Sequence, residues 1–135
     1  MDLIKKHGDC VLVIGLAFKG FPATNDLRNS TAVEIAMGIR KISKEIKVID
    51  AVASETEIMN EGFNIYEVGR FNPNVICILN NHRENKQILR SILSKKRYDS
   101  QVSFGIFDPW NMIDESDLQG HKASISTLSK YREYE

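Results

Sequence analysis

The chain has 135 residues, 42% of them hydrophobic and 27% charged, which is the composition of one ordinary globular domain. Its 18 basic and 18 acidic residues give a formal net charge of zero, and this argues against general nucleic-acid binding, which requires a clustered excess of Lys and Arg. No apolar run approaches the roughly 18 residues that span a membrane, and the first residues lack the hydrophobic core of a signal peptide, so we expect a cytoplasmic protein without membrane partners.

Short apolar segments alternate with amphipathic ones along the chain. The uninterrupted apolar run over residues 10–16 predicts a central strand that is buried on both faces. A polar loop follows, after which Thr31 and Glu34 have capping-box spacing, with Ser30 as an alternative N-cap. Further strands are predicted at residues 46–50, 63–68, 74–79 and 102–107, and helices at 32–42, 54–61 and 84–95.

Strands that alternate with helices imply right-handed βαβ crossovers and a parallel sheet. We therefore predict an α/β fold, a doubly wound, Rossmann-like three-layer sandwich with a five-stranded, mainly parallel sheet in the order 3-2-1-4-5. The 135 residues are expected to form a single domain with a core at about 9–115. The polar C-terminal tail, residues 116–135, is predicted to pack loosely, with a short terminal helix over 126–134.

Ligands of such sheets lie beyond the carboxyl ends of the strands, at the switch point between strands 1 and 4. Three predicted loops meet there, at residues 15–29, 80–83 and 108–111. The first is too long for a plain βα turn, which suggests a binding loop, and it has neither a dinucleotide glycine fingerprint nor a Walker lysine-serine pair. Lys19 and Arg28 are placed to reach phosphate or sugar oxygens; the alternatives are a solvated Lys19 and an Arg28 paired with Asp26.

The first loop carries a motif that resembles a known family. The run GLAFKG at residues 15–20, followed by TNDLRNS at 24–30, resembles the segment that opens the UDP-binding C-terminal domain of UDP-glucose/GDP-mannose dehydrogenases. That family's pattern is roughly G-[LF]-[AS]-[FY]-K-x-x-x-x-D-x-R-x-S, and the spacer between lysine and aspartate is longer here. The likeness continues at residues 48–50, 80–82 and 108–111.

The resemblance implies a UDP-sugar-binding domain that contributes the sugar-nucleotide half of an NAD-dependent oxidoreductase site in polysaccharide precursor synthesis. It implies substrate-binding roles for Phe18, Lys19, Gly20, Trp110 and Asn111, a cofactor-facing role for Arg28, and supporting roles for Asp26, His82 and Asp108. Trp110 stands where the family usually has an arginine. An indole cannot give a diphosphate bidentate bonds but can stack on a base or sugar; the alternative is that it packs against the C-terminal tail. Arg83 and Arg70 are candidates for the missing charge.

Two parts of the family's chemistry have no counterpart in this sequence. There is no glycine-rich NAD domain, and Cys10 and Cys77 fall in predicted core strands that do not resemble the surroundings of the family's catalytic cysteine. We expect both to be reduced core thiols. The chain is therefore expected to bind but not to oxidise by itself, and to meet NAD only through a partner domain; an excised domain, a split-gene partner and a free-standing protein all stay open.

Other classes of site and function were also weighed. His82 has no second His, Cys or carboxylate at ligand spacing, so we predict no metal site and expect a structural hydrogen bond from His82 to a neighbouring loop. Partners implied by the resemblance are a UDP-sugar and either an NAD-binding dehydrogenase domain or a second copy of the chain. The alternative function is an interaction or oligomerisation module that keeps the fold but has lost nucleotide binding.

Overall fold

The computed structural model describes residues 2–17, 31–67, 69–95, 103–127 and 131–134, the last of these by their backbone only. Its helices are α1 (Asp2–His7), α2 (Thr31–Ile42), α3 (Glu55–Asn60), α4 (Asn85–Lys95) and the 3-10 helix η1 (Glu115–Leu118). Its strands are β1 (Cys10–Ile14), β2 (Glu45–Ile49), β3 (Asn64–Ile65), β4 (Val75–Ile78), β5 (Phe104–Phe107), β6 (Ala123–Ser126) and β7 (Tyr131–Tyr134).

The strands form one sheet in the order β3-β2-β1-β4-β5-β6-β7. The first six in this order pair in parallel, and β7 pairs antiparallel with β6. The predicted Rossmann-like α/β architecture and the order 3-2-1-4-5 are therefore confirmed. The prediction of five strands is wrong, because β6 extends the parallel sheet beyond β5 and β7 lies along β6.

The central strands are covered on both faces, as the apolar run predicted. Val11 and Val13 point into a core that contains the buried residues of α1, α2 and α3. Leu12 and Ile14 point to the other side, into a core that contains those of α4 and η1. This alternation follows from the two-residue period of a strand, and it gives the three layers of the sandwich.

The helices match their predicted positions closely. α2 buries Ala32, Val33, Ala36 and Ile39 against the sheet. The predicted helix at 54–61 is α3, where Ser54 is the N-cap in a capping box with Glu57, and Gly62 follows at a φ of +91°. α4 begins one residue later than predicted and ends where expected. None of the described helices has the length and apolar character needed to cross a membrane.

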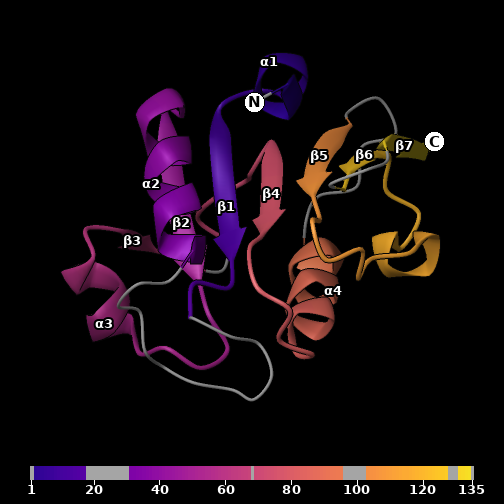
Figure 1. Cartoon of the computed structure of the whole chain (residues 1–135). Coiled ribbons are helices and arrows are strands. Elements are labelled where there is room, and N and C mark those ends of the chain that lie inside the picture. Colours follow the sequence, from indigo (N-terminus) through magenta and orange to yellow (C-terminus); the bar gives the residue numbers. More distant parts are fainter. Residues whose placement is uncertain (1, 18–30, 68, 96–102, 128–130, 135) are drawn as a thin grey trace.

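The N-terminal helix α1 was not predicted, and a glycine in β5 makes room for it. A Cβ on Gly105 would lie 3.0 Å from His7 Cδ2 and 3.1 Å from Leu3 Cδ2. The His7 ring lies within hydrogen-bonding distance of two hydroxyls, with Nε2 3.0 Å from Ser124 Oγ and Nδ1 3.3 Å from Ser103 Oγ. α1 therefore packs directly on β5, at the end of the sheet where the strands begin (Figure 1).

The prediction for the C-terminal residues is wrong in two respects. Residues 131–134 form a strand and not a helix, and the segment before them is well packed, with Leu118 at 1%, Ala123 at 3% and Ile125 at 0% exposure. β6 pairs with β5 over four residues, from Phe104 with Ala123 to Phe107 with Ser126. Without β6, the hydrogen-bonding groups of β5 would lie at an open edge. Residues 123–126 have a weak strand pattern in the sequence, and they form a strand because their backbone pairs with this open edge.

Candidate functional site

The candidate site lies at the edge of the sheet where β1, β4 and β5 end, since these parallel strands all point the same way (Figure 1). The described parts of the three predicted loops at this edge are residues 15–17, 80–83 and 108–111. Five of the residues that we assigned to the site, Phe18, Lys19, Gly20, Asp26 and Arg28, lie outside the described residues. The geometry of the site is therefore built from Trp110, Asn111, His82, Asp108 and the groups around them.

Gly15 brings the first loop against the turn that follows β4. Its φ is +94°, and a Cβ at this position would lie 2.5 Å from Asn80 Oδ1. Only glycine combines that backbone conformation with so close an approach. Loops that are 65 positions apart in the sequence are thus in direct contact at the switch point between β1 and β4.

Asp50, directly after β2, holds the start of the first loop. Its Oδ2 accepts hydrogen bonds from the backbone N–H groups of Leu16 and Ala17, the latter at 2.9 Å. Its Oδ1 accepts two more, from Val52 and Ala53, both at 2.7 Å. A carboxylate has about four lone-pair sites, so these four N–H groups satisfy it.

Asn80, two residues after the end of β4, holds the same loop from the other side. Its Nδ2 donates to the carbonyl oxygen of Ala17 at 3.3 Å. Asn85, the first residue of α4, donates from Nδ2 to the carbonyl oxygen of Asn80 at 2.9 Å and to its Oδ1 at 2.7 Å. Asn85 Oδ1 is buried and has no hydrogen-bond partner among the described residues. One bond from the Asn85 amide therefore holds the Asn80 backbone and the other holds the Asn80 side chain.

His82 makes a local hydrogen bond in the turn between β4 and α4. It is 7% exposed, its backbone N–H donates to Asn80 Oδ1 at 3.2 Å, and its Nδ1 accepts from the backbone N–H of Glu84 at 3.2 Å. This bond lies within the turn that carries His82 and does not reach another loop. Because Nδ1 accepts this bond, it carries no proton. The His82 ring thus helps to shape the turn at the start of α4.

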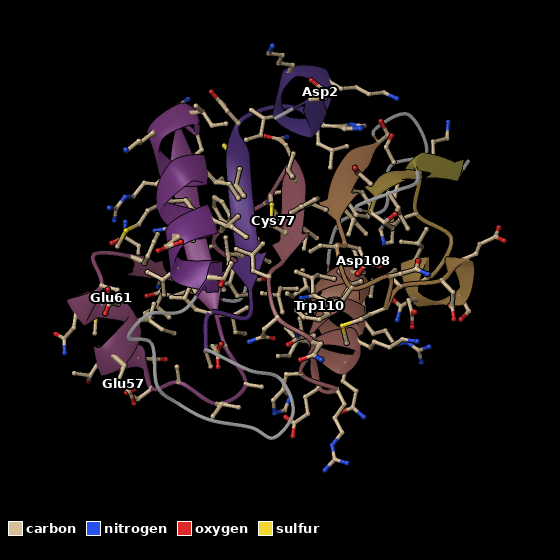
Figure 2. All side chains as sticks on the ribbon, viewed as in Figure 1. Asp2, Glu57, Glu61, Cys77, Asp108 and Trp110 are labelled. Carbon is tan, nitrogen blue, oxygen red and sulfur yellow. The ribbon has the colours of Figure 1, made fainter. Side chains whose placement is uncertain are left out.

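The loop after β5 presents Trp110 on a rigid turn (Figure 2). Asp108 is fully buried, and its two oxygens accept the backbone N–H groups of Met112 at 3.0 Å and Ile113 at 2.9 Å. Asn111, with φ at +52°, donates its N–H to the carbonyl oxygen of Asp108 at 3.0 Å. Trp110 at the tip is 53% exposed, so the indole is not buried against the C-terminal segment.

Ion pairs tie this loop to α4. Asp117, whose side chain is 0% exposed, lies 2.6 Å from the guanidinium of Arg90 and 3.2 Å from Lys86 Nζ. Asp114 caps η1 in a reciprocal capping box with Asp117. A hydrogen bond from Ser116 is the main cause that lowers the pKa of the Asp114 carboxyl; desolvation opposes it, and the Lys86 ammonium and hydrogen bonds with Asp117 lower it further. The segment that follows Trp110 is therefore attached to α4.

An apolar cavity of about 220 Å³ lies between α4 and the ends of β2 and β3. Its walls include Ile49, Tyr66, Ile88 and Ile92, and Glu84 lies at its border beside the His82 turn. Burial raises the pKa of the Tyr66 hydroxyl. Gln87 and Ser91 also line the cavity, so polar groups from α4 lie beside its apolar walls.

The described residues show no group of three or more His, Cys, Asp or Glu side chains arranged to hold a metal ion. Cys10 is half-buried and Cys77 is buried, and both are free thiols. Burial raises the pKa of Cys77 to about 12, and only a thiolate is a strong nucleophile. Cys77 is thus an unreactive core thiol. Among the described residues, the carboxyl edge of the sheet offers groups for hydrogen bonding and stacking, and no cluster of metal ligands or nucleophilic thiolate.

The sequence interpretation missed Asn85 as part of the site and treated Asp50 and Asn80 only as parts of motifs. The available signal was positional, since Asp50 is the last residue of one predicted strand and Asn80 directly follows another. Parallel strands bring such residues to one edge. Which backbone groups they would hold depends on loop paths that local sequence does not specify.

One comparison with known proteins identifies the family. The UDP binding domain of the UDP-glucose/GDP-mannose dehydrogenase family matches residues 12–115, a range that contains the described parts of all three edge loops. No curated protein matches the chain significantly. Because the match covers most of the 135 residues, the chain belongs to the UDP-glucose/GDP-mannose dehydrogenase family and contains its UDP-binding domain.

Proposed function

We propose that this chain binds a UDP-sugar at the carboxyl edge of its sheet. The observation that carries the proposal is that the family match spans all three loops that meet at this edge. Phe18, Lys19 and Gly20 would contribute from the first loop, and Trp110 and Asn111 from the loop after β5. The edge lies at the switch point of a doubly wound sheet, the common place for ligands in this architecture.

Trp110 is suited to stacking on the uracil or the sugar. Its ring is more than half exposed, while Asp108 beneath it fixes the turn that presents it. Arg83, at the end of the turn after β4, is exposed and makes no ion pair with the residues that the structure describes. It is the best-placed described cation to supply the charge that Trp110 lacks. Arg70 instead pairs with Glu67 at 3.5 Å.

We further propose that NAD reaches this site only on a partner domain, which Arg28 would face. Dinucleotide-binding sheets use an acidic residue after the second strand to bind ribose hydroxyls. Asp50 occupies that place here, but four backbone N–H groups already use its oxygens. The chain would then supply half of a site for oxidising a nucleotide sugar in polysaccharide precursor synthesis, with Asp26, His82 and Asp108 supporting the loops.

The test is isothermal titration of the purified chain with UDP, UDP-glucose, UDP-N-acetylglucosamine, GDP-mannose and NAD. Half a site should bind a UDP-sugar with a Kd of about 10 μM to 1 mM. NAD alone should produce no saturable heat. The affinity should fall in Lys19→Ala, since that ammonium would contact sugar or pyrophosphate oxygens.

Two matched pairs of variants examine the individual contacts. Arg83→Ala should weaken UDP binding while Arg70→Ala leaves it unchanged, because Arg70 lies on the β3–β4 connection and pairs with Glu67. Trp110→Ala should weaken binding more than Trp110→Phe, which keeps an aromatic face. If a folded chain binds none of the nucleotides, the proposal is wrong and the interaction-module alternative gains support.

A further inference from the structure

We propose that Asp50 and Asn80 are positioning residues of the nucleotide site, and that they act by holding the backbone N–H and C=O of one residue, Ala17. This inference rests on the proposed function, because it concerns the loop that would carry Phe18 and Lys19. It assigns neither residue a contact with the ligand. Asp50 follows β2 and Asn80 follows β4, the two strands that flank β1 in the sheet.

The clamp uses both polar groups at one residue. The N–H of Ala17 donates to Asp50 Oδ2 at 2.9 Å, and its carbonyl oxygen accepts from Asn80 Nδ2 at 3.3 Å. Leu16 adds a second N–H to the same Asp50 oxygen. Fixing a residue at its donor and its acceptor leaves the chain little freedom in direction at that point. Phe18 is the next residue.

The surroundings of the clamp make it stiff and bury all of its members except Asp50, which is partly exposed. Leu16 and Ala17 are 0% exposed and Asn80 is 3% exposed. Asn85 Nδ2 and the His82 backbone N–H both donate to Asn80 Oδ1, so the Asn80 side chain cannot turn away from Ala17 without losing these bonds. The Asp50 oxygens are filled by the four backbone N–H groups.

The opposite end of β1 provides a natural control. There Asn74 accepts the backbone N–H of Cys10 through Oδ1 at 3.2 Å, and a Cβ on Gly8 would lie 2.7 Å from this oxygen. This arrangement resembles that of Gly15 and Asn80, with an asparagine side chain against a glycine beside β1. It lies at the edge where the strands begin, away from the candidate site.

The deciding variant is Asp50→Asn, because a positioning role and a purely electrostatic role predict opposite signs. Removing a negative charge near an anionic diphosphate would tighten UDP binding if only charge mattered. An amide can satisfy only part of the four N–H groups, so a positioning role predicts weaker binding. We expect the Kd for UDP to rise about tenfold, the change that corresponds to one lost hydrogen bond.

Asn80→Ala should raise the Kd similarly, and it keeps the test valid if Asp50→Asn fails to fold. Asn74→Ala should lower the melting temperature but leave the Kd for UDP unchanged. Titration with a diphosphate of 2′,3′-dideoxyuridine adds a check, since Asp50→Asn should weaken this ligand by the same factor as UDP. A loss confined to UDP would mean that Asp50 binds the ribose, which would overturn the inference.

Amide hydrogen exchange tests the clamp without any ligand. Exchange at Leu16 and Ala17 should be slow in the wild-type chain, faster in Asp50→Asn and unaffected in Asn74→Ala. If exchange accelerates at these amides while UDP affinity stays equal or improves, the clamp does not position the site and the inference is wrong. If the wild-type chain does not bind UDP at all, the proposed function fails first and this inference fails with it.

Discussion

Cys77 shows how burial determines the chemistry of a single residue. It lies in β4, in the middle of the sheet (Figure 2), and is 0% exposed. Its pKa of about 12 means that the folded chain keeps the thiol protonated where an unfolded chain would lose the proton. Burial in the core therefore makes the Cys77 thiol unreactive.

Thiol labelling should reveal this difference. At pH 8, we expect Cys77 to react with a disulfide reagent only at the rate of global unfolding. Stability should also decline as pH rises above about 8.5, since the unfolded thiol then ionises and the folded one does not. Labelling followed by peptide mass mapping measures the first effect. Rapid modification of Cys77 in the native chain would contradict it.

Asp114 should contribute to the acid sensitivity of the fold. The Ser116 hydrogen bond and Lys86 hold its folded-state pKa below the ordinary value. A lowered pKa stabilises the folded state at pH above about 4 and loses that effect as pH falls through the lowered value. Asp114→Asn should therefore flatten the decline in stability between about pH 5 and pH 3. Urea unfolding at several pH values measures it, and an unchanged slope would count against the assignment.

At the scale of elements, ion pairs between α4 and η1 attach the segment that follows Trp110 to the rest of the fold. The Asp117 carboxylate is fully buried, while its partners Arg90 and Lys86 are partly exposed. The carboxylate depends on these cations, because an unpaired buried charge is costly. This pairing joins two segments that are 27 positions apart.

Arg90→Ala should destabilise the fold by about 2 kcal/mol, since it leaves a buried carboxylate with fewer partners. Arg70→Ala is the matched control, because Arg70 and Glu67 form an exposed pair and such pairs contribute little. Chemical denaturation compares the two variants. Equal costs would mean that the Arg90 pair is no stronger than a surface pair.

Two errors in the predicted elements have one physical origin. α1 and β6 have short sequences with modest periodicity, and each is stabilised by β5. α1 depends on the missing side chain of Gly105, and β6 depends on the open edge of β5. Local patterns do not contain such partners, so the long apolar strands were predictable and these two elements were not.

At the scale of the whole molecule, the fold extends beyond the family match. The match ends at residue 115, but Leu118, Ala123 and Ile125 are part of the same core as the α4 face of the sheet. The sheet therefore depends on residues that the predicted core excluded. β6 should behave as an integral strand and not as an appendage.

Ile125→Ala should destabilise the chain by about 3 kcal/mol, the typical cost of truncating a fully buried isoleucine. Ile42→Ala, the same substitution at a position that is 52% exposed, should cost less than about 0.5 kcal/mol. Thermal unfolding of both variants tests the difference. Similar small effects would show that β6 contributes little to the core.

The sequence by itself determined the class of the fold, the order of its first five strands and the family. Hydrophobic runs report burial on both faces of a strand, and the first-loop motif lies in one continuous segment, so both signals are local. The prediction that three loops meet at one edge followed from parallel connectivity alone.

Only the tertiary structure decided how that edge is built. Asp50 and Asn80 are 30 positions apart in the sequence, yet both hold Ala17. The exposure of Trp110, the pairing of β6 and the docking of α1 likewise depend on contacts between distant segments. The periodicity of apolar residues shows which side chains are buried on folding. Which other residues each of them contacts depends on which chain segments the sheet places side by side.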